Sequence, residues 1–584
     1  MKANIGDIIY GFKVLRVREI EELAGTLYEF RHERTGAEAV WLSRSEKNKT
    51  FFVGFKTVPG DDTGVFHILE HSLLCGSDKF PVKEPFVELL KSSMQTFLNA
   101  FTFPDKTVFP VSSQNEKDFL NLTEIYLDAV FCPAIYKQPE IFYQEGWHYE
   151  IFHEQEEPSY KGVVFNEMKG ALSSVDSVIQ SGMNALLFPD NCYRYESGGD
   201  PKHIPELSYD QFLETHRLFY QMSNAKFFLD GDAPVEEVLR MIDEDYAGKA
   251  PGYEKAEGDG KTSDFDTSEG DGKTPDIEVH TENRKSLEEV LQIPYQKDQE
   301  HPRRVCSYPV APEEGSENKT YISFGKIIGT WEDKEKQFAY DILCSYLAGS
   351  NEAPLKKAIL EKGLGQDVNL GLVDGVQQPW LLLTVRNTEE AHEDEIKKTL
   401  VETLKRLLAE GLDHDSLAAN LNFAEFQCRE RNYGFMTEGI GLGLSALNAW
   451  LYGGDPALYL TCKEVFASLR EGLGHGLFEE LLEEFLQKKD SVATLVCVPS
   501  ETLAAEQQAE ERKALAEAKA SWSSEELQQH LEENQRIEKW QGTPDTTDAL
   551  DCIPKLGRED IVEEPEKIET KTHIIGGVTV LEHK

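Results

Sequence analysis

Basic residues are scarce in this chain compared with acidic ones. Lysine and arginine number 60 against 105 aspartates and glutamates, which gives a formal net charge of −45 over 584 residues. A chain of this charge repels phosphate backbones and attracts cationic molecules. The composition therefore argues against nucleic acid as a partner and favours encounters with basic peptides.

Long apolar runs and paired cysteines are also missing. No stretch reaches the roughly 18 apolar residues of a membrane span, and the amino terminus MKANIGDIIYGFKVLRVREI lacks the apolar core of a signal peptide. The nine cysteines are scattered and include no C-x-x-C pair, which argues against a disulfide framework and against a thiolate zinc site. We therefore expect reduced thiols, a cytoplasmic location and no membrane association.

One compositional break divides the chain. Over residues 251–300, Gly, Asp, Lys and Thr replace the apolar periodicity found on either side, and EGDGKTSDFDTS (257–268) is followed by the similar EGDGKTPDIEVH (269–280). A repeated acidic, glycine-rich unit is typical of a surface linker or insertion. The break therefore predicts a linker between two larger parts of the chain.

Two glycine-containing motifs suggest nucleotide binding but do not meet its requirements. Each repeat contains Gly-Lys-Thr, yet Lys255 and Thr267 stand where a P-loop needs its first glycine. GIGLGLSAL (439–447) has no strand pattern before it, as a dinucleotide-binding loop would. We interpret the second motif as a helix that packs closely against a neighbour.

Strand-like and helical patterns alternate on both sides of the break. Runs such as WLLLTVRN and SVATLVCV have the composition of strands, and EDEIKKTLVETLKRLLAEG has the periodicity of an amphipathic helix. The mixture predicts an α+β protein with two domains, over residues 1–250 and 301–502. Residues 503–545 are almost wholly helix-forming, and a capping box of Ser523 and Glu526 would start a second helix there, so we expect a helical hairpin that links larger bodies.

The motif HILEH combines His67, Glu70 and His71. The stretch around it lacks Gly and Pro, so a helix is allowed, and there the two histidines lie on one face with the glutamate beside them. Such a pair can bind zinc, and the carboxylate can deprotonate a zinc-bound water, which is the chemistry of the H-x-x-E-H motif. Two surface histidines would give the same spacing, so a third ligand has to decide between a zinc site and coincidence.

Glu167, in YKGVVFNEMKGALSS (160–174), is the candidate for that ligand. We expect GVVF to form a strand and Glu167 to open the helix that follows it. A single glutamate in so acidic a chain carries little weight by position alone, so its sequence context matters more.

Four stretches in order resemble the catalytic half of the pitrilysin-type (M16) metallopeptidases, and among them the presequence protease and falcilysin subfamily. They are HILEHSLLCGS (67–77), LNAFTFPDKTVFPVSS (98–113), YQEGWHYE (143–150) and GVVFNEMKGALSS (162–174). The likeness continues through AYDILCSYLAGSNEAPLKKAILEKGLGQDV (339–368) and WLYGGDP (450–456). It therefore covers nearly the whole chain.

The resemblance implies a fold and a metal site. The fold is the LuxS/MPP-like metallohydrolase fold, with two related α+β domains, each a mostly antiparallel sheet packed by helices. His67, His71 and Glu167 would bind one Zn²⁺, and Glu70 would be the general base of a zinc metalloendopeptidase.

The resemblance also implies a substrate site and a partner. Asn99, Ala100 and Phe101 match the edge strand to which an unfolded peptide is added as an extra strand. Residues 546–584 look like the start of a second half, so we expect a C-terminal M16 half, from the same gene or a separate chain, to complete the chamber. The first twenty residues are not Ser-rich and acid-poor as in a transit peptide, so we expect a bacterial cytoplasmic oligopeptidase.

Alternatives remain for the protein and for two single residues. The chain could be a non-catalytic M16-fold scaffold that needs a partner chain, or an unrelated acidic protein in which the motif is accidental. Cys75, one turn beyond His71, is either a small buried residue or a thiol whose oxidation disturbs the site. His148 either packs in the core or supports a metal ligand.

Overall fold

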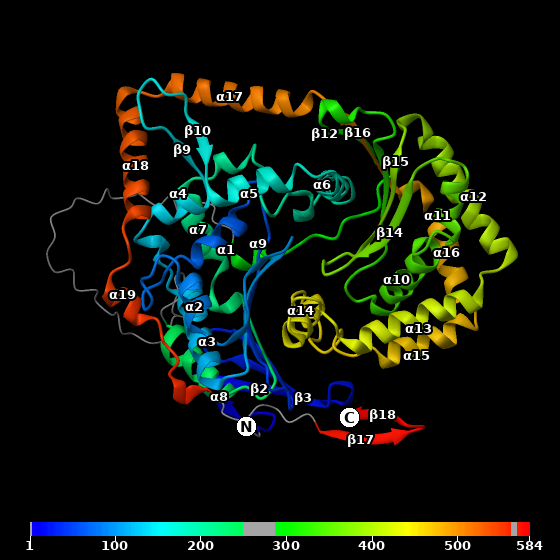
Figure 1. Cartoon of the computed structure of the whole chain (residues 1–584), viewed down its shortest axis with the longest axis horizontal. Helices are drawn as coiled ribbons and strands as arrows, with labels where there is room; N and C mark the ends of the chain where they lie inside the picture. The colour runs from blue at the N-terminus through cyan, green and yellow to red at the C-terminus, as the bar shows by residue number, and fades with distance from the viewer. Residues whose placement is uncertain (1–2, 249–285, 562–568, 584) are drawn as a thin grey trace.

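The computed structural model of the protein describes residues 3–248, 286–561 and 569–583. We call residues 3–248 the first unit and residues 286–500 the second unit. Figure 1 shows the first unit on the left, the second on the right, and helices α17 and α18 along the top and the left edge. The repeat predicted at 257–280 lies outside the described residues, and the predicted 251–300 linker is described only from residue 286 onward.

The first unit is built on a nine-stranded sheet of order β1-β2-β3-β4-β11-β5-β8-β6, with β7 also paired to β8. β4 and β11 run parallel, and the other neighbouring strands run antiparallel. The strands are β1 (Ile8–Ile9), β2 (Phe12–Ile20), β3 (Gly25–His32), β4 (Glu38–Ser43), β5 (Lys49–Lys56), β6 (Gln95–Leu98), β7 (Phe101–Thr102), β8 (Lys106–Ser113) and β11 (Ala225–Asp230).

Helices of the same unit cover one face of this sheet, where Phe51, Phe55, Phe109 and Phe227 belong to a large buried core. Each strand and helix has a single apolar face, and packing the helices on the sheet buries both faces in one core. The helices are α1 (Val65–Leu73), α2 (Pro85–Ser92), α3 (Glu116–Phe131), α4 (Glu140–Glu145), α5 (Val163–Ala171), α6 (Val175–Leu187), α7 (Tyr209–Phe219) and α8 (Val235–Arg240); β9 (His148–Glu150) and β10 (Ser159–Lys161) form a separate hairpin.

The second unit repeats the pairing pattern around a five-stranded sheet of order β12-β16-β13-β15-β14. β16 runs parallel to β12 and antiparallel to β13, just as β11 runs parallel to β4 and antiparallel to β5. In each unit the last strand, β11 or β16, is thus inserted between two earlier strands of that unit. This repeat, and the mostly antiparallel sheets packed by helices, confirm the predicted α+β fold class.

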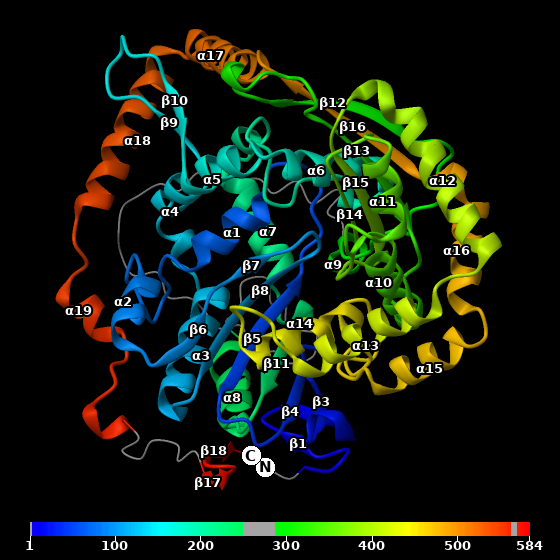
Figure 2. The ribbon, with the colours of Figure 1, turned by 45° about the vertical axis from the view of Figure 1, so that its right-hand side comes forward.

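The elements of the second unit occupy these positions: α9 (Leu287–Val290), β12 (Arg303–Pro309), β13 (Thr320–Ile327), α10 (Lys334–Ala348), α11 (Pro354–Glu361), β14 (Asp367–Val373), β15 (Trp380–Thr388), α12 (Glu393–Glu410), α13 (His414–Glu430), α14 (Glu438–Trp450), α15 (Lys463–Leu473), α16 (Leu477–Gln487) and β16 (Ala493–Ser500). Helices α10, α11, α12 and α16 lie on the outer side of the sheet (Figures 1 and 2).

The units exchange one helix each. Helix α14 of the second unit packs on the other face of the first sheet, against β5, β8 and β11 (Figure 2). Here Phe52 and Phe228, which alternate with the core residues of the opposite face, pack with Leu442 and Leu447 of α14. In return, α6 of the first unit packs on β12, β13 and β16.

Glycine is what allows α14 to approach so closely. A Cβ atom at Gly443 would lie 2.2 Å from the ring of Phe52, and one at Gly439 would lie 2.3 Å from the Thr50 hydroxyl. No side chain fits in that space, so the backbone of the helix rests on the sheet. The prediction that GIGLGLSAL is a packed helix is confirmed.

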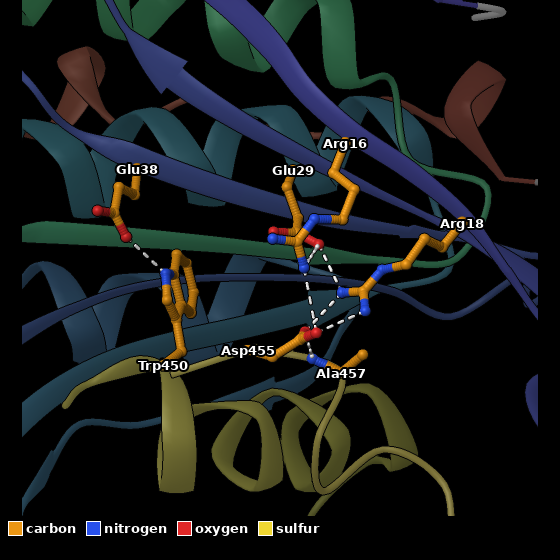
Figure 3. A network of polar contacts seen from close by, with 7 residues as sticks. All are labelled: Arg16, Arg18, Glu29, Glu38, Trp450, Asp455 and Ala457. Atoms are coloured by element: carbon orange, nitrogen blue, oxygen red, sulfur yellow. Dashed lines mark hydrogen bonds and ion pairs between the residues drawn. The ribbon is translucent and has the colours of Figure 1, made fainter. Parts of the chain in front are cut away.

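A polar network closes the edge of this contact (Figure 3). Asp455, just beyond α14, accepts hydrogen bonds from Arg16 at 3.1 Å and from Arg18 at 2.5 and 2.6 Å. Arg18 also pairs with Glu29 at 2.5 Å, and the Trp450 indole donates to Glu38. Burial alone would raise the pKa of Asp455, but the Arg18 contacts outweigh it and lower that pKa.

The linker predicted at 503–545 consists of α17 (Leu503–Ser521) and α18 (Ser524–Gly542), and the capping box of Ser523 and Glu526 is present. The expected hairpin is wrong, because the two helices meet at a corner (Figure 1). Their surfaces explain the difference: α17 contacts β12, whereas α18 contacts α4 and β9. Glu511 of α17 also pairs with Lys169 of the first unit at 2.7 Å. Each helix is thus held by the bodies that it touches, and these contacts do not fold one helix onto the other.

Beyond α19 (Thr547–Cys552), strands β17 (Thr570–Ile575) and β18 (Val578–His583) pair as an exposed hairpin. Among the described helices, none combines the length and the apolar character needed to cross a bilayer. All nine cysteines are free thiols.

Replacing Gly443 with Ala is expected to lower the free energy of unfolding by about 1–3 kcal/mol, because the added methyl group overpacks the contact with Phe52. Gly170→Ala in α5 is the matched control: its Cβ would meet nothing within 4 Å, and Ala is the better helix former by about 1 kcal/mol. Denaturant unfolding measures both. If Gly443→Ala and Gly170→Ala change the free energy of unfolding equally, α14 does not rest on the sheet as closely as described.

His216 in α7 is expected to make stability depend on pH. It is fully buried, with Nε2 3.0 Å from the Val130 carbonyl oxygen and Nδ1 2.7 Å from the Tyr136 hydroxyl. Burial lowers the pKa of His216 to about 4, whereas an unfolded histidine titrates near about 6.5. The unfolded state therefore binds more protons in this window, and stability is lost as the pH falls from about 6.5 toward 4.

Unfolding free energies measured across that window should fall less steeply for His216→Gln than for the wild type. The exposed His153 provides the control, since His153→Gln should leave the slope unchanged. A wild-type slope retained in His216→Gln would rule out this residue as the source.

Candidate metal centre

Helix α1 presents the HILEH motif as predicted. It starts after Gly64, whose φ is +67° and where a Cβ atom would lie 2.6 Å from the backbone of Gly198 and Gly199, so that only glycine fits. The helix buries Phe66, Ile68, Leu69 and Leu73 in the first-unit core. His67 and His71 therefore lie on its opposite side, with side chains that are 12% and 25% exposed.

Glu167 lies in the middle of α5, and the expected strand before it is wrong. Gly162 caps α5, and the residues of GVVF that follow form its first turn. Val164 and Met168, four residues apart, are both buried, which is the spacing of a helix face; a short apolar run does not by itself distinguish strand from helix. The helix leaves the Glu167 side chain 53% exposed beside the two histidines.

The structure brings the three predicted ligands together. Oε2 of Glu167 lies 3.8 Å from Nε2 of His67 and 3.6 Å from Nε2 of His71. One ligand atom from each residue can be chosen so that all lie within 4.8 Å of one another, and in the described part of the chain this is the one group of three His, Cys, Asp or Glu residues that does so. Tetrahedral zinc with bonds of about 2.0–2.2 Å holds its ligands slightly closer together, so a small contraction would fit the set to that ion.

Hydrogen bonds orient both imidazoles. Nδ1 of His67 lies 2.9 Å from the carbonyl oxygen of Gly198, and Nδ1 of His71 lies 3.3 Å from Oε2 of Glu145. With Nδ1 donating to these oxygens, Nε2 is left free to bind a metal, which is the usual arrangement of histidine ligands.

Glu145 is a candidate residue of the site that the sequence patterns did not reveal. It ends α4, its side chain is 10% exposed, and Gln144 donates to its other oxygen at 2.8 Å. The available signal was an acidic residue two positions after the apolar run IFY of this helix, because a buried carboxylate requires partners. Its partner, His71, is far away in the sequence and became evident only in the fold.

Glu70 is held next to the cluster by β7. The hydroxyl of Thr102 donates to Oε2 of Glu70 at 2.7 Å. Burial alone would lower the pKa of His71, but the hydrogen bond to Glu145 and the charges of Glu70, Glu145 and Glu167 outweigh it and raise that pKa. The cluster is therefore surrounded by negative charge, which favours a cation.

Asn99, Ala100 and Phe101 lie at the sheet edge, but they do not form one continuous strand. β6 ends before Asn99, and β7 begins at Phe101. Within the described chain, both strands pair only with β8. The Asn99 carbonyl accepts a hydrogen bond from the Tyr126 hydroxyl at 3.1 Å, so the chain turns inward there and the free edge resumes at Phe101.

Of the two residues with open alternatives, Cys75 is partly buried against the core and His148 is buried. Cys75 donates through Sγ to the His71 carbonyl at 3.5 Å, and burial raises the pKa of the Cys75 thiol well above its usual value. A thiol with such a pKa reacts poorly with oxidants at neutral pH. His148 is buried, with Nδ1 2.7 Å from the Tyr143 carbonyl oxygen, and it does not join the cluster.

Two family models match the chain. The model described as "Peptidase M16 inactive domain" matches residues 206–422. A model of the region associated with subfamily C of the M16 peptidases matches residues 497–584. The cluster of His67, His71 and Glu167 precedes both matched regions.

Curated relatives align over nearly the whole chain. Protein HypA of Clostridium perfringens is 38% identical over 100% of this chain and 56% of its own length. Presequence protease 1 of Arabidopsis thaliana is 36% identical over 98% of this chain and 51% of its own. The mitochondrial presequence protease of Danio rerio is 31% identical over 96% and 52%. The chain thus spans about half the length of these relatives.

Solved structures with low sequence identity share the fold. A protease from Helicobacter pylori has a TM-score of 0.59 at 14% identity and covers 80% of this chain and 97% of its own. Pitrilysin has a TM-score of 0.54 at 14% identity, over 90% of this chain and 50% of its own. The periplasmic protease PqqL from Escherichia coli has a TM-score of 0.54 at 15% identity, over 98% and 55%.

Replacing Glu145 with Gln is expected to lower the pKa of His71, because it removes the hydrogen-bonded carboxylate that offsets the effect of burial. NMR titration of the imidazole signals in metal-free protein measures this change. Glu140→Gln on the same helix is the control, since Glu140 pairs with Arg536 at 2.7 Å and not with the cluster. An unchanged His71 pKa in Glu145→Gln would show that Glu145 does not act on this histidine.

Proposed function

The chain belongs to the M16 peptidases, in the presequence protease group, and we propose that it is the N-terminal, catalytic half of a zinc-dependent endopeptidase of unfolded oligopeptides. The observation that carries the proposal is the cluster of His67, His71 and Glu167 with Glu70 beside it. The relatives are named as proteases, which supports a peptidase. We infer the zinc chemistry from the cluster.

The donor set fits one Zn²⁺. Two neutral imidazoles and one carboxylate are the ligands of several catalytic zinc sites, and such sites keep a fourth position open. His67 and His71 would bind through Nε2, oriented by Gly198 and Glu145, and Glu167 would bind through its carboxylate. Zinc bound there would supply Lewis-acid polarisation of a carbonyl and a lowered pKa for water.

Glu70 would be the general base that moves the proton. Thr102 holds one of its carboxylate oxygens, so the other oxygen is available to accept a proton from an attacking water and to return it to the leaving amine. Glu145 keeps the His71 imidazole in the orientation that this site needs. Glu70 lies on α1, Thr102 on β7 and Glu145 on α4, so three different elements of the fold would contribute to this step.

A peptide substrate would add to the sheet edge at β7. Strand addition uses main-chain hydrogen bonds and so accepts many sequences, provided that the peptide is extended. The net charge of −45 favours basic peptides. Because the chain spans about half the length of its relatives, we propose that a C-terminal M16 half completes the chamber around Phe101 and the cluster. We also propose that the protein acts in a bacterial cytoplasm, where its free thiols persist.

A second function is favoured by the model named for an inactive M16 domain, which matches residues 206–422. A scaffold subunit would use the same fold without catalysis. The matched region does not include the cluster, so the match does not decide between the two functions. A peptidase needs His71 for zinc and Glu70 for cleavage, whereas a scaffold needs neither.

Elemental analysis should find about one zinc per purified chain, and His71→Ala should lose it, because two remaining ligands bind zinc weakly. His203→Ala serves as the control, since His203 does not belong to the cluster. A quenched basic peptide should be cleaved by the wild type and at least about 100-fold more slowly by Glu70→Gln, which should retain its zinc.

The outcomes separate the two functions. If the wild type binds zinc but does not cleave the peptide, catalysis needs the C-terminal half. Cleavage should then appear when that half is added in trans. Absence of zinc from the wild type, even after dialysis against zinc, would overturn the peptidase proposal and favour the scaffold.

A further inference from the structure

Two cysteines face each other across neighbouring strands of the second sheet. Cys306 lies on β12 and Cys497 on β16, and the register of this parallel pair places them directly opposite one another. Their Sγ atoms are 3.0 Å apart, although 191 positions separate the two residues in the chain. The fold thus creates a pair of thiols that the sequence pattern did not predict.

The spacing of the two strands suits a covalent bond between the sulfur atoms. Neighbouring strands lie about 4.7–4.9 Å apart, and the Cα atoms that a disulfide joins are usually about 4.4–6.8 Å apart. An S–S bond is about 2.05 Å long, so the two sulfur atoms would have to approach by about 1 Å. Small rotations of the two side chains provide that approach while the strands stay paired.

The two thiols differ in their access to solvent. β12 is the edge strand of the second sheet, and within the described chain it pairs only with β16. Cys306 is partly exposed there, whereas Cys497 is 0% exposed and belongs to the core that α6 covers. A small oxidant from the solvent therefore reaches Cys306 first.

The surroundings of Cys306 favour its thiolate form. The Cys497 thiol donates a hydrogen bond to Sγ of Cys306 and lowers the pKa of Cys306, and the positive charge of Arg304 lowers it further, although burial opposes both. The same contact and burial raise the pKa of Cys497, which therefore keeps its proton. The thiolate is the form of cysteine that attacks oxidants. Cys306 is thus the nucleophile of the pair, and Cys497 is the thiol beside it.

We propose that Cys306 and Cys497 form a peroxide-sensitive thiol pair, which closes to a disulfide in the folded protein. The Cys306 thiolate attacks one oxygen of hydrogen peroxide, the O–O bond breaks, and the hydroxide that leaves takes up a proton from solvent to become water. Cys497 then attacks the sulfenic acid formed at Cys306: the S–S bond forms, the S–O bond breaks, and the leaving hydroxide takes the Cys497 proton. One peroxide is reduced to two waters while two thiols are oxidised.

A second pair of neighbouring thiols is less suited to this reaction. Cys428 and Cys462 also contact each other, but Sγ of Cys462 lies 3.6 Å from a carboxylate oxygen of Glu22. The negative charge of Glu22 acts on Cys428 more strongly than the positive charge of Lys334 or of Arg431, and it opposes a thiolate there. We therefore expect peroxide to close the pair on β12 and β16 in preference to this one.

Thiol mapping of the whole chain tests the proposal. The protein is treated with about two equivalents of hydrogen peroxide at neutral pH, alkylated and digested, and the peptides are identified by mass spectrometry. We expect the loss of about two thiols per chain, a linked peptide that contains Cys306 and Cys497, and recovery of both thiols after dithiothreitol. Cys306→Ser should abolish the linkage. Cys552→Ser is the matched control, because Cys552 is exposed and donates to the Asp548 carbonyl and not to a thiol.

A second variant tests the roles of the two sulfur atoms. In Cys497→Ala the sulfenic acid at Cys306 has no thiol to react with, so dimedone should trap it at least about tenfold more than in the wild type. Closing the bond in the wild type should raise the midpoint of thermal unfolding by at least about 2 °C, because the bond restricts the unfolded chain. Cys306→Ser should show no such rise after peroxide.

Several results would overturn the proposal. They are no linkage in the wild type, a linkage only between Cys428 and Cys462, a linkage that forms only in denaturant, and a midpoint that peroxide leaves unchanged or lowers. Zinc content and peptide cleavage do not enter these measurements, so the test stands apart from the proposed function.

Discussion

The exchange of α14 and α6 between the two units is the contact on which the rest of the structure depends. Each helix covers the second face of the other unit's sheet, so neither sheet could be fully buried by its own helices. The contact is close because glycines remove side chains from it, at Gly443 on one side and at Gly182, whose Cβ would lie 2.9 Å from Leu495, on the other. The two units therefore form one body, and the polar network of Asp455 closes its edge.

The same exchange positions the proposed metal cluster. Glu167 lies on α5, which contacts α1 and α4, and α5 continues almost directly into α6, which is packed on the second sheet. At its other end α5 starts at Gly162, where a Cβ would lie 2.0 Å from the Gly146 carbonyl. Glu167, the proposed third ligand, is thus held at both ends of its helix, while His67 and His71 are held by the first sheet. A site built across two rigid supports keeps its geometry better than one built on a loop.

Local patterns could predict those features that neighbouring residues decide. The α1 helix, the capping box of Ser523 and Glu526 and the packed α14 helix all follow from short-range spacing, and each was predicted. The strand assigned to GVVF was wrong because a four-residue apolar run suits either a strand or the first turn of a helix. The hairpin of α17 and α18 was wrong because the direction of a polar helix is set by the bodies that it touches, which the local pattern does not contain.

By itself, the sequence determined the fold class, the helix that carries HILEH and the family, because apolar periodicity and motif order are properties of the chain. Only the tertiary structure decided that Glu145 orients His71 and that Asn99 turns inward to Tyr126. These contacts join residues far apart in the chain. Their energies depend on distance and burial in three dimensions, and neither quantity is a function of sequence spacing.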